Sequence, residues 1–280
     1  MQANNSTKNM MMFPKQTKEV LCKIEKATKG NLGSYKKSIP SILLVGDVGA
    51  GRSEFAQEYE SILKSNHVYT IRGTNTFLDL TFPKYGEEID YRKFFRSPGV
   101  AASIQNRFYG VFAISFEEWK GHDLLDSPRF KELLRFIDNN KDNIFYVFEV
   151  TSGFKAKEEF KRVLNNHINI AEACLKQPDI QMSAEYIQYC MESDGLVLDS
   201  SGEKELHEFL IRRLNIESPG FAGYKTLRQI SKSILFELLT DNSHKTGQME
   251  VTGNMLRNIE SRIITPGDIS TRKQTIGFTM

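Results

Sequence analysis

The sequence has few cysteines, almost no excess of either charge and no long apolar run, and each shortage excludes a class of protein. Its 280 residues include 37 basic and 35 acidic side chains, a net charge of +2, which gives no electrostatic reason to expect nucleic acid or an anionic membrane as a partner. No stretch approaches the roughly 20 apolar residues that a membrane span needs. Residues 1–15 contain no apolar core of the kind found in secretory signals. We therefore expect a cytoplasmic protein.

Metal-binding patterns are also missing. Cys22, Cys174 and Cys190 are odd in number and widely spaced, which excludes the usual metal patterns and indicates a reducing compartment. The five histidines never pair at ligand spacing, so surface or packing roles are expected for them. Apolar content of 40% and charged content of 26% are ordinary values for a globular chain.

Short apolar runs alternate with helical patterns over much of the chain. Strands are predicted at 41–46, 67–73, 110–116, 143–150 and 179–183, and helices at 15–29, 53–64, 127–140 and 156–165. Strands that are apolar throughout and separated by helices are typical of a parallel sheet buried on both faces. Ligands bind such a sheet at the carboxyl ends of its strands. Residues 74–100, with two prolines and two glycines, are expected to be irregular.

The pattern changes near Ala184, after which only helices are predicted, at 184–193, 202–214, 224–239 and 251–263. We therefore predict four segments: an N-terminal leader with one helix over residues 1–37, an α/β domain over 38–183, a small all-helical domain over 184–264, and an exposed tail over 265–280.

The first predicted strand leads directly into a glycine-rich turn that reads Gly-Asp-Val-Gly-Ala-Gly-Arg-Ser at 46–53. It fits the phosphate-loop pattern Gly-x4-Gly-[Lys/Arg]-Ser/Thr, in which backbone N–H groups surround a phosphate and the next helix adds its positive N-terminal end. Average residue frequencies give about 0.02 chance occurrences in a chain of this length. The predicted ligands of ATP are Gly46, Asp47, Val48, Gly49, Ala50, Gly51, Arg52, Ser53 and Glu54. Ser53 would also hold Mg²⁺.

Arg52 stands where such a loop more often has lysine. Lysine is a compact point charge, whereas a guanidinium is a broad planar fork that can pair with phosphate through two hydrogen bonds. We therefore expect nucleotide binding to be weakened and hydrolysis to be slow.

Several segments together resemble the AAA+ ATPases, most closely the branch with red-type rubisco activase and stage V sporulation protein K. The resemblance covers roughly residues 38–262, and only the phosphate loop is specific by itself. Residues 133–160 are similar to the family's helix, fourth strand and the segment after it, and 195–210 to its lid segment, where a glycine and a short extended piece precede a helix. The resemblance implies a P-loop NTPase (AAA+) fold: a parallel five-stranded sheet with helices on both faces, followed by a small all-helical lid domain.

The resemblance also assigns catalytic roles. Strand 110–116 is similar to the family's Walker B strand and ends in Glu117 and Glu118. Glu117 would hold Mg²⁺, and Glu118 would polarise the attacking water. A shifted register would instead put Ser115 and Phe116 at these positions and leave no catalysis, and a solvated acidic strand end is the plain structural alternative.

Residues 221–234 look like the stretch that carries the sensor-2 arginine. The match puts Lys225 at sensor 2 and Arg228 at the second arginine, where such residues contact the γ-phosphate. Thr151, or Ser152 beside it, would serve as sensor 1, and Tyr85 is a candidate pore aromatic. Hydroxyls at strand ends and tyrosines packed in loops are common, so ordinary structural roles stay open for these last residues.

The departures from the family bear on activity. Residues 165–179, where the resemblance implies an arginine finger, contain no arginine, and Arg162 is only a remote substitute. An arginine finger accelerates hydrolysis by about 10³–10⁵. With these departures, the resemblance implies a weak or partner-dependent ATPase that uses ATP and Mg²⁺, forms homo- or hetero-oligomers, and remodels or assembles other proteins. The alternative is a catalytically inactive nucleotide-binding scaffold or adaptor within an AAA+ assembly.

Overall fold

The computed structural model describes residues 13, 15–29, 39–68, 76–85, 110–218, 220–241 and 249–265. They form two compact units. The first contains the described residues up to Asp47 together with Gly51–Lys176, and the second contains Val48–Ala50 together with the described residues from Gln177 on. In these ranges no helix has both the length and the apolar character needed to span a bilayer.

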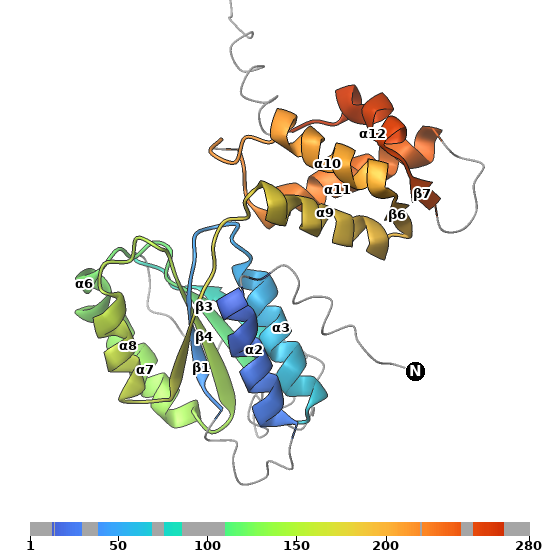
Figure 1. The fold of residues 1–280 in the computed structure, drawn as a ribbon. Helices are drawn as coiled ribbons and strands as arrows, with labels where there is room; N and C mark the ends of the chain where they lie inside the picture. Colours follow the sequence, from blue (N-terminus) through green and yellow to red (C-terminus); the bar gives the residue numbers. More distant parts are fainter. Residues whose placement is uncertain are drawn as a thin grey trace, which may run out of the picture. The chain divides into compact units, whose positions relative to one another are not determined.

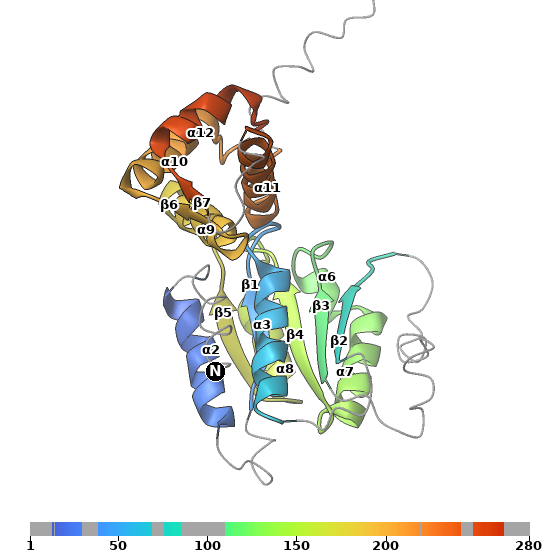
Figure 2. The ribbon, with the colours of Figure 1, turned by 90° about the vertical axis from the view of Figure 1, so that its right-hand side faces the viewer.

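The first unit is a parallel sheet of five strands in the order β2-β3-β4-β1-β5. Helices α2 and α3 lie on one face of the sheet, and α7 and α8 on the other (Figures 1 and 2). In chain order the elements are α2 (Lys15–Thr28), β1 (Ser41–Val45), α3 (Arg52–Ser65), β2 (Phe77–Thr81), β3 (Gly110–Ser115), α6 (His122–Leu125), α7 (Pro128–Asn140), β4 (Ile144–Val150), α8 (Lys157–Asn165) and β5 (Ile170–Cys174). The predicted α/β class and the predicted parallel five-stranded sheet are confirmed.

Three of the predicted strands and the four predicted helices of this unit agree with the structure to within two residues at each end. The predicted second strand, 67–73, is wrong where the structure describes it, because His67 and Val68 lie in a turn after α3 and residues 69–73 fall outside the described residues. The second strand is instead β2, inside the segment predicted to be irregular. It is an edge strand with partly exposed side chains and carries Asp79, so it lacks the continuous apolar run of a central strand.

The predicted fifth strand, 179–183, is also wrong. These residues begin helix α9 (Ile180–Ser193), because the carboxylate of Asp179 accepts a hydrogen bond from the Met182 amide and caps the helix. The fifth strand is β5, at the other edge of the sheet. Its sequence includes Glu172, and this charge hid the strand from a search for apolar runs.

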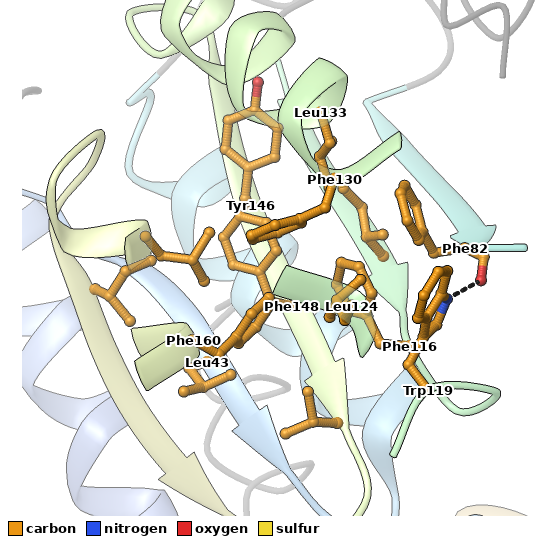
Figure 3. Close-up of a cluster of buried hydrophobic side chains, with 14 of the residues drawn as sticks. Leu43, Phe82, Phe116, Trp119, Leu124, Phe130, Leu133, Tyr146, Phe148 and Phe160 are labelled. Atoms are coloured by element: carbon orange, nitrogen blue, oxygen red, sulfur yellow. Dashed lines mark hydrogen bonds between the residues drawn. The ribbon is translucent and has the colours of Figure 1, made fainter. Parts of the chain in front are cut away.

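The main hydrophobic core lies between the sheet and helices α7 and α8 (Figure 3). Alternate side chains of a strand point to opposite faces, and on this face β3 and β4 contribute large residues: Phe112, Ile114, Tyr146 and Phe148, with Phe116 just after β3. The ring of Phe116 lies 5.0 Å from that of Phe82 and 5.3 Å from that of Phe160 between centroids. The Trp119 indole N–H donates to the Phe82 carbonyl at 3.0 Å, which closes the core beside β2.

The second unit is mainly helical, as predicted for the lid domain. Its elements are α9, β6 (Leu196–Leu198), α10 (Ser200–Arg213), α11 (Tyr224–Asp241), β7 (Met249–Val251), α12 (Gly253–Ile259) and a 3₁₀ turn, η3 (Glu260–Arg262). Strands β6 and β7 form a short parallel pair that the prediction of an all-helical domain did not include. Strand β6 follows Gly195 and precedes α10, as the resemblance of 195–210 implied.

A buried carboxylate joins two helices of this unit. Glu205 of α10 is 2% exposed and pairs with the guanidinium groups of Arg212 at 2.6 Å and of Arg257, on α12, at 2.5 Å. A buried charge is tolerated when it is paired and hydrogen-bonded. These pairs lower the pKa of Glu205 despite its burial.

Replacing Phe116 tests the core of the first unit. We expect Phe116→Ala to lower the free energy of unfolding by about 3–5 kcal/mol, because the side chain is fully buried and its loss leaves a cavity. The matched control is Phe236→Ala, whose ring is 66% exposed. Urea denaturation followed by circular dichroism measures both changes, and equal effects would contradict the placement of Phe116 in the core.

Candidate active site at the strand ends

The glycine-rich turn lies between β1 and α3, at the carboxyl edge of the sheet, as predicted. The Gly46 amide donates to the Val150 carbonyl at 2.9 Å, which continues the pairing of β1 with β4. The Asp47 carboxylate accepts hydrogen bonds from the Ser152 amide at 3.0 Å and hydroxyl at 2.8 Å. The first two residues of the turn are thus fixed to the segment after β4, and Ser152 serves to hold the turn.

The apex of the turn, Val48–Ala50, belongs to the second unit. The Gly49 carbonyl accepts a hydrogen bond from the Tyr224 amide at 3.1 Å, at the start of α11. Both Gly49 (φ 87°) and Gly223 (φ 56°) have left-handed backbone, and a Cβ atom on Gly223 would lie 1.9 Å from the Gly49 oxygen. Only glycine fits at these two positions. The apex therefore supplies a backbone carbonyl that accepts a hydrogen bond from the first N–H group of α11.

The far end of the turn starts helix α3. Gly51 is the N-cap, with φ 91°, and no side chain of the described residues caps the helix. The first N–H groups of a helix need an acceptor and attract anions. Ser53 is exposed in this first turn, and Glu54 beside it is half-buried. The start of α3 thus offers its first N–H groups without a side-chain acceptor.

The Arg52 side chain points toward two carboxylates that follow or end neighbouring strands. Its Nη2 lies 3.1 Å from Glu117 Oε2, and its Nε lies 3.6 Å from Glu149 Oε2. Arg52 is 8% exposed and Glu149 is 7% exposed. The third nitrogen of the guanidinium, Nη1, is buried without a hydrogen-bond partner among the described residues. One donor group of the predicted phosphate-loop cation is therefore unsatisfied.

A cavity of about 380 Å³ lies beside Arg52, on the α3 face of the sheet. It exists because β3 places its large side chains on the core face and small ones, Ala113 and Ser115, on this face. The Ser115 hydroxyl is also buried without a partner among the described residues. Two unsatisfied polar atoms thus belong to side chains that line one cavity. The lining residues are Arg52, Ser53, Gln57, Phe77, Asp79, Leu80, Thr81, Ala113, Ser115, Glu117 and Glu149.

The cavity wall is acidic. Three carboxylates, those of Asp79, Glu117 and Glu149, line it with one cation, Arg52. Burial raises the pKa of Glu149 to about 7; the Arg52 charge opposes this shift, and the charges of Glu117, Asp79 and Glu54 add to it. Glu149 therefore titrates near neutral pH.

The structure separates the two predicted Walker B acids. Glu117 lines the cavity, whereas the Glu118 carboxylate accepts a hydrogen bond from the Lys84 amide at 3.0 Å and is not among the cavity-lining residues. Ser115, which the alternative register favoured, lines the cavity with Glu117, and Phe116 between them is in the core. The end of β3 therefore directs Ser115 and Glu117 to the site.

Three further predicted site residues are not among those that line the cavity. Thr151 is half-buried after β4 and does not line the cavity, and Lys225 and Arg228 are exposed on α11 of the second unit. Tyr85 is 80% exposed, and the residues that follow it are outside the described ranges.

Sequence reasoning missed Asp79 and Glu149. Asp79 lies in a segment predicted to be irregular. Glu149 had a signal, because it is the one charged residue in the apolar run of β4, and a charge in a central strand indicates a buried partner.

No protein-family model and no curated protein sequence matches the chain. Among solved structures it is similar to RuvB of Thermotoga maritima, described as a Holliday junction branch migration motor, with 13% identity, a TM-score of 0.50 and coverage of 92% of this chain and 75% of that one. The K64R mutant of that RuvB gives 14% identity, a TM-score of 0.51 and the same two coverages. The chain therefore shares the fold of these structures. At such low identity the likeness shows the fold alone, and it confirms the fold class that the sequence predicted.

The pKa of Glu149 predicts a pH-dependent effect of Glu149→Gln on stability. The folded protein holds this proton more tightly than the unfolded chain, so the contribution of Glu149 to stability falls as pH rises from about 4.5 to about 7. Glutamine cannot ionise. We therefore expect the variant to gain about 2 kcal/mol relative to wild type between pH 5.5 and pH 8.

Urea denaturation at the two pH values measures this difference. The control is Glu158→Gln, since the Glu158 side chain is 80% exposed, and we expect its effect to be the same at both values. A difference between Glu149→Gln and wild type that is constant with pH would contradict the assignment of a raised pKa.

Proposed function

We propose that this chain binds ATP with Mg²⁺ at the turn 46–53, as a weak or partner-dependent ATPase that remodels or assembles other proteins. The unsatisfied Nη1 of Arg52 is the observation that carries the proposal. A buried donor without an acceptor costs free energy, and a phosphate oxygen is an acceptor that suits a guanidinium. The uncapped start of α3, to which Arg52 itself belongs, adds N–H groups for the same anion.

The side chains beside Arg52 fit a phosphate-bound magnesium ion. Ser53 and Glu117 line the cavity, and hydroxyl and carboxylate oxygens are the ligands that Mg²⁺ prefers. The ion would neutralise charge on the outer phosphates. Lys225 and Arg228, exposed on α11, are the proposed contacts of the γ-phosphate.

Two features support slow or partner-dependent hydrolysis. Two of the three guanidinium nitrogens of Arg52 already lie near carboxylates, so a nucleotide has to compete for this cation. Residues 165–179, which include β5, contain no arginine, so an arginine finger would have to come from a partner subunit. The same features favour the second candidate function, a nucleotide-binding scaffold without hydrolysis.

The partners are proposed in general terms. The similar solved structures are of RuvB, so the narrower branch with rubisco activase and stage V sporulation protein K rests on the sequence resemblance. RuvB is described as a branch migration motor, and for this reason the near-neutral charge of the chain does not by itself argue against nucleic acid. Protein clients and other AAA+ subunits remain the proposed partners.

Calorimetry with Mg-ATP tests nucleotide binding. We expect binding that Arg52→Gln weakens at least tenfold, because the substitution removes the cation and its buried Nη1. Arg135→Ala, an exposed position on α7, is the matched control and should bind as wild type does. No heat from wild type at millimolar ATP, with no competition by ADP, would overturn the proposal.

Phosphate release separates the ATPase from the scaffold. We expect a slow rate that Glu117→Gln lowers at least tenfold and Glu118→Gln lowers less, because Glu117 faces the cavity and Glu118 does not line it. A wild-type rate equal to that of buffer, with nucleotide bound, would favour the scaffold. A larger loss with Glu118→Gln than with Glu117→Gln would contradict the placement of the two acids.

A further inference from the structure

We propose that Glu149 sets the preference of the site between nucleoside triphosphate and diphosphate, by disfavouring the terminal phosphate. This inference rests on the proposed nucleotide binding. The cavity lies next to Arg52, the predicted phosphate-loop cation, and Ser53, the predicted Mg²⁺ ligand. A terminal phosphate held by them would face the acidic wall. The inference concerns a residue that no phosphate-loop pattern contains.

The position of Glu149 is fixed by the sheet. It lies near the end of β4, which pairs with β1 on one side and β3 on the other. Its carbonyl accepts a hydrogen bond from the Phe116 amide at 2.8 Å, and the whole residue is 7% exposed. A carboxylate on a central strand cannot swing out into solvent as a surface glutamate can. Its carboxyl group therefore stays beside Arg52 whatever the ligand is, and at pH 8 it is mainly ionised.

The cations that line the cavity do not balance its acids. Arg52 is the one basic residue among the lining residues, and Glu117 and Glu149 share its charge. A triphosphate brings about one negative charge more than a diphosphate, and like charges a few ångströms apart repel strongly where water is scarce. We therefore expect the acidic wall to weaken the binding of the triphosphate more than that of the diphosphate.

The substitution Glu149→Gln isolates the charge. Glutamine has nearly the same shape, and it keeps a side-chain oxygen beside Arg52 Nε. We expect the ratio of ATP affinity to ADP affinity to rise about tenfold, a change that corresponds to about 1.4 kcal/mol. Loss of local structure would change the affinity for both nucleotides together, so the ratio distinguishes the two causes.

The experiment measures the dissociation constants of ATP and ADP by calorimetry at pH 8, with and without Mg²⁺. It compares wild type with Glu149→Gln, Glu149→Asp and the exposed control Glu158→Gln. We expect Glu149→Asp, which keeps the charge, and Glu158→Gln to preserve the wild-type ratio. The effect of Glu149→Gln should be largest without Mg²⁺, since the ion screens the terminal phosphate. Asp79→Asn, on the exposed edge strand, should shift the ratio in the same direction by less, and it provides the test if Glu149→Gln does not fold.

An unchanged ratio in Glu149→Gln and Asp79→Asn, with both nucleotides bound, would overturn the inference and leave nucleotide binding intact. If Glu149→Asp changed the ratio of ATP affinity to ADP affinity as much as Glu149→Gln does, that result would assign the effect to side-chain shape. It would overturn the inference as well. Absence of binding by either nucleotide to every variant would overturn the proposed function, and this inference with it.

Discussion

Burial of the Arg52 guanidinium constrains the whole carboxyl edge of the sheet. A buried cation is stable only when acceptors surround it, and here the acceptors come from chain positions 117 and 149. A parallel sheet brings such distant positions together, because it aligns the carboxyl ends of β1, β3 and β4 at one edge. Arg52 starts the helix that follows β1. These ion pairs can therefore form only because the sheet has this strand order.

The two faces of β3 have different roles: one packs in the hydrophobic core, and the other lines the cavity of the candidate site. Phe112 and Ile114 point into the core against α7 and α8, while Ala113 and Ser115 point toward α3 and leave the cavity. A single strand of alternating large and small residues thus builds a packed core on one face and a polar hollow on the other. Because of the same alternation, Glu117 lines the cavity together with Ser115, whereas Phe116 between them lies in the core.

The turn 46–53 illustrates what a local motif determines. Gly49 and Gly51 adopt left-handed backbone, and the helix after the turn begins without a side-chain cap. The glycines of the turn allow this backbone by themselves, so the motif predicted the strand, turn and helix well. The direction of the Arg52 side chain depends on the charges of Glu117 and Glu149, which lie far away in the sequence. No local pattern contains that information.

The prediction of the two edge strands failed for a related reason. Central strands were found because burial on both faces makes them apolar throughout, as in β1 and β4. The edge strands β2 and β5 carry Asp79 and Glu172, and a search for apolar runs passed over both. In β5 the charge is stabilised by Lys157 at 2.8 Å and Lys161 at 2.7 Å, again from another element. In the central strand β4, by contrast, a charged residue did not hide the strand. Glu149 is buried within the apolar run of β4, and it lines the cavity of the candidate site.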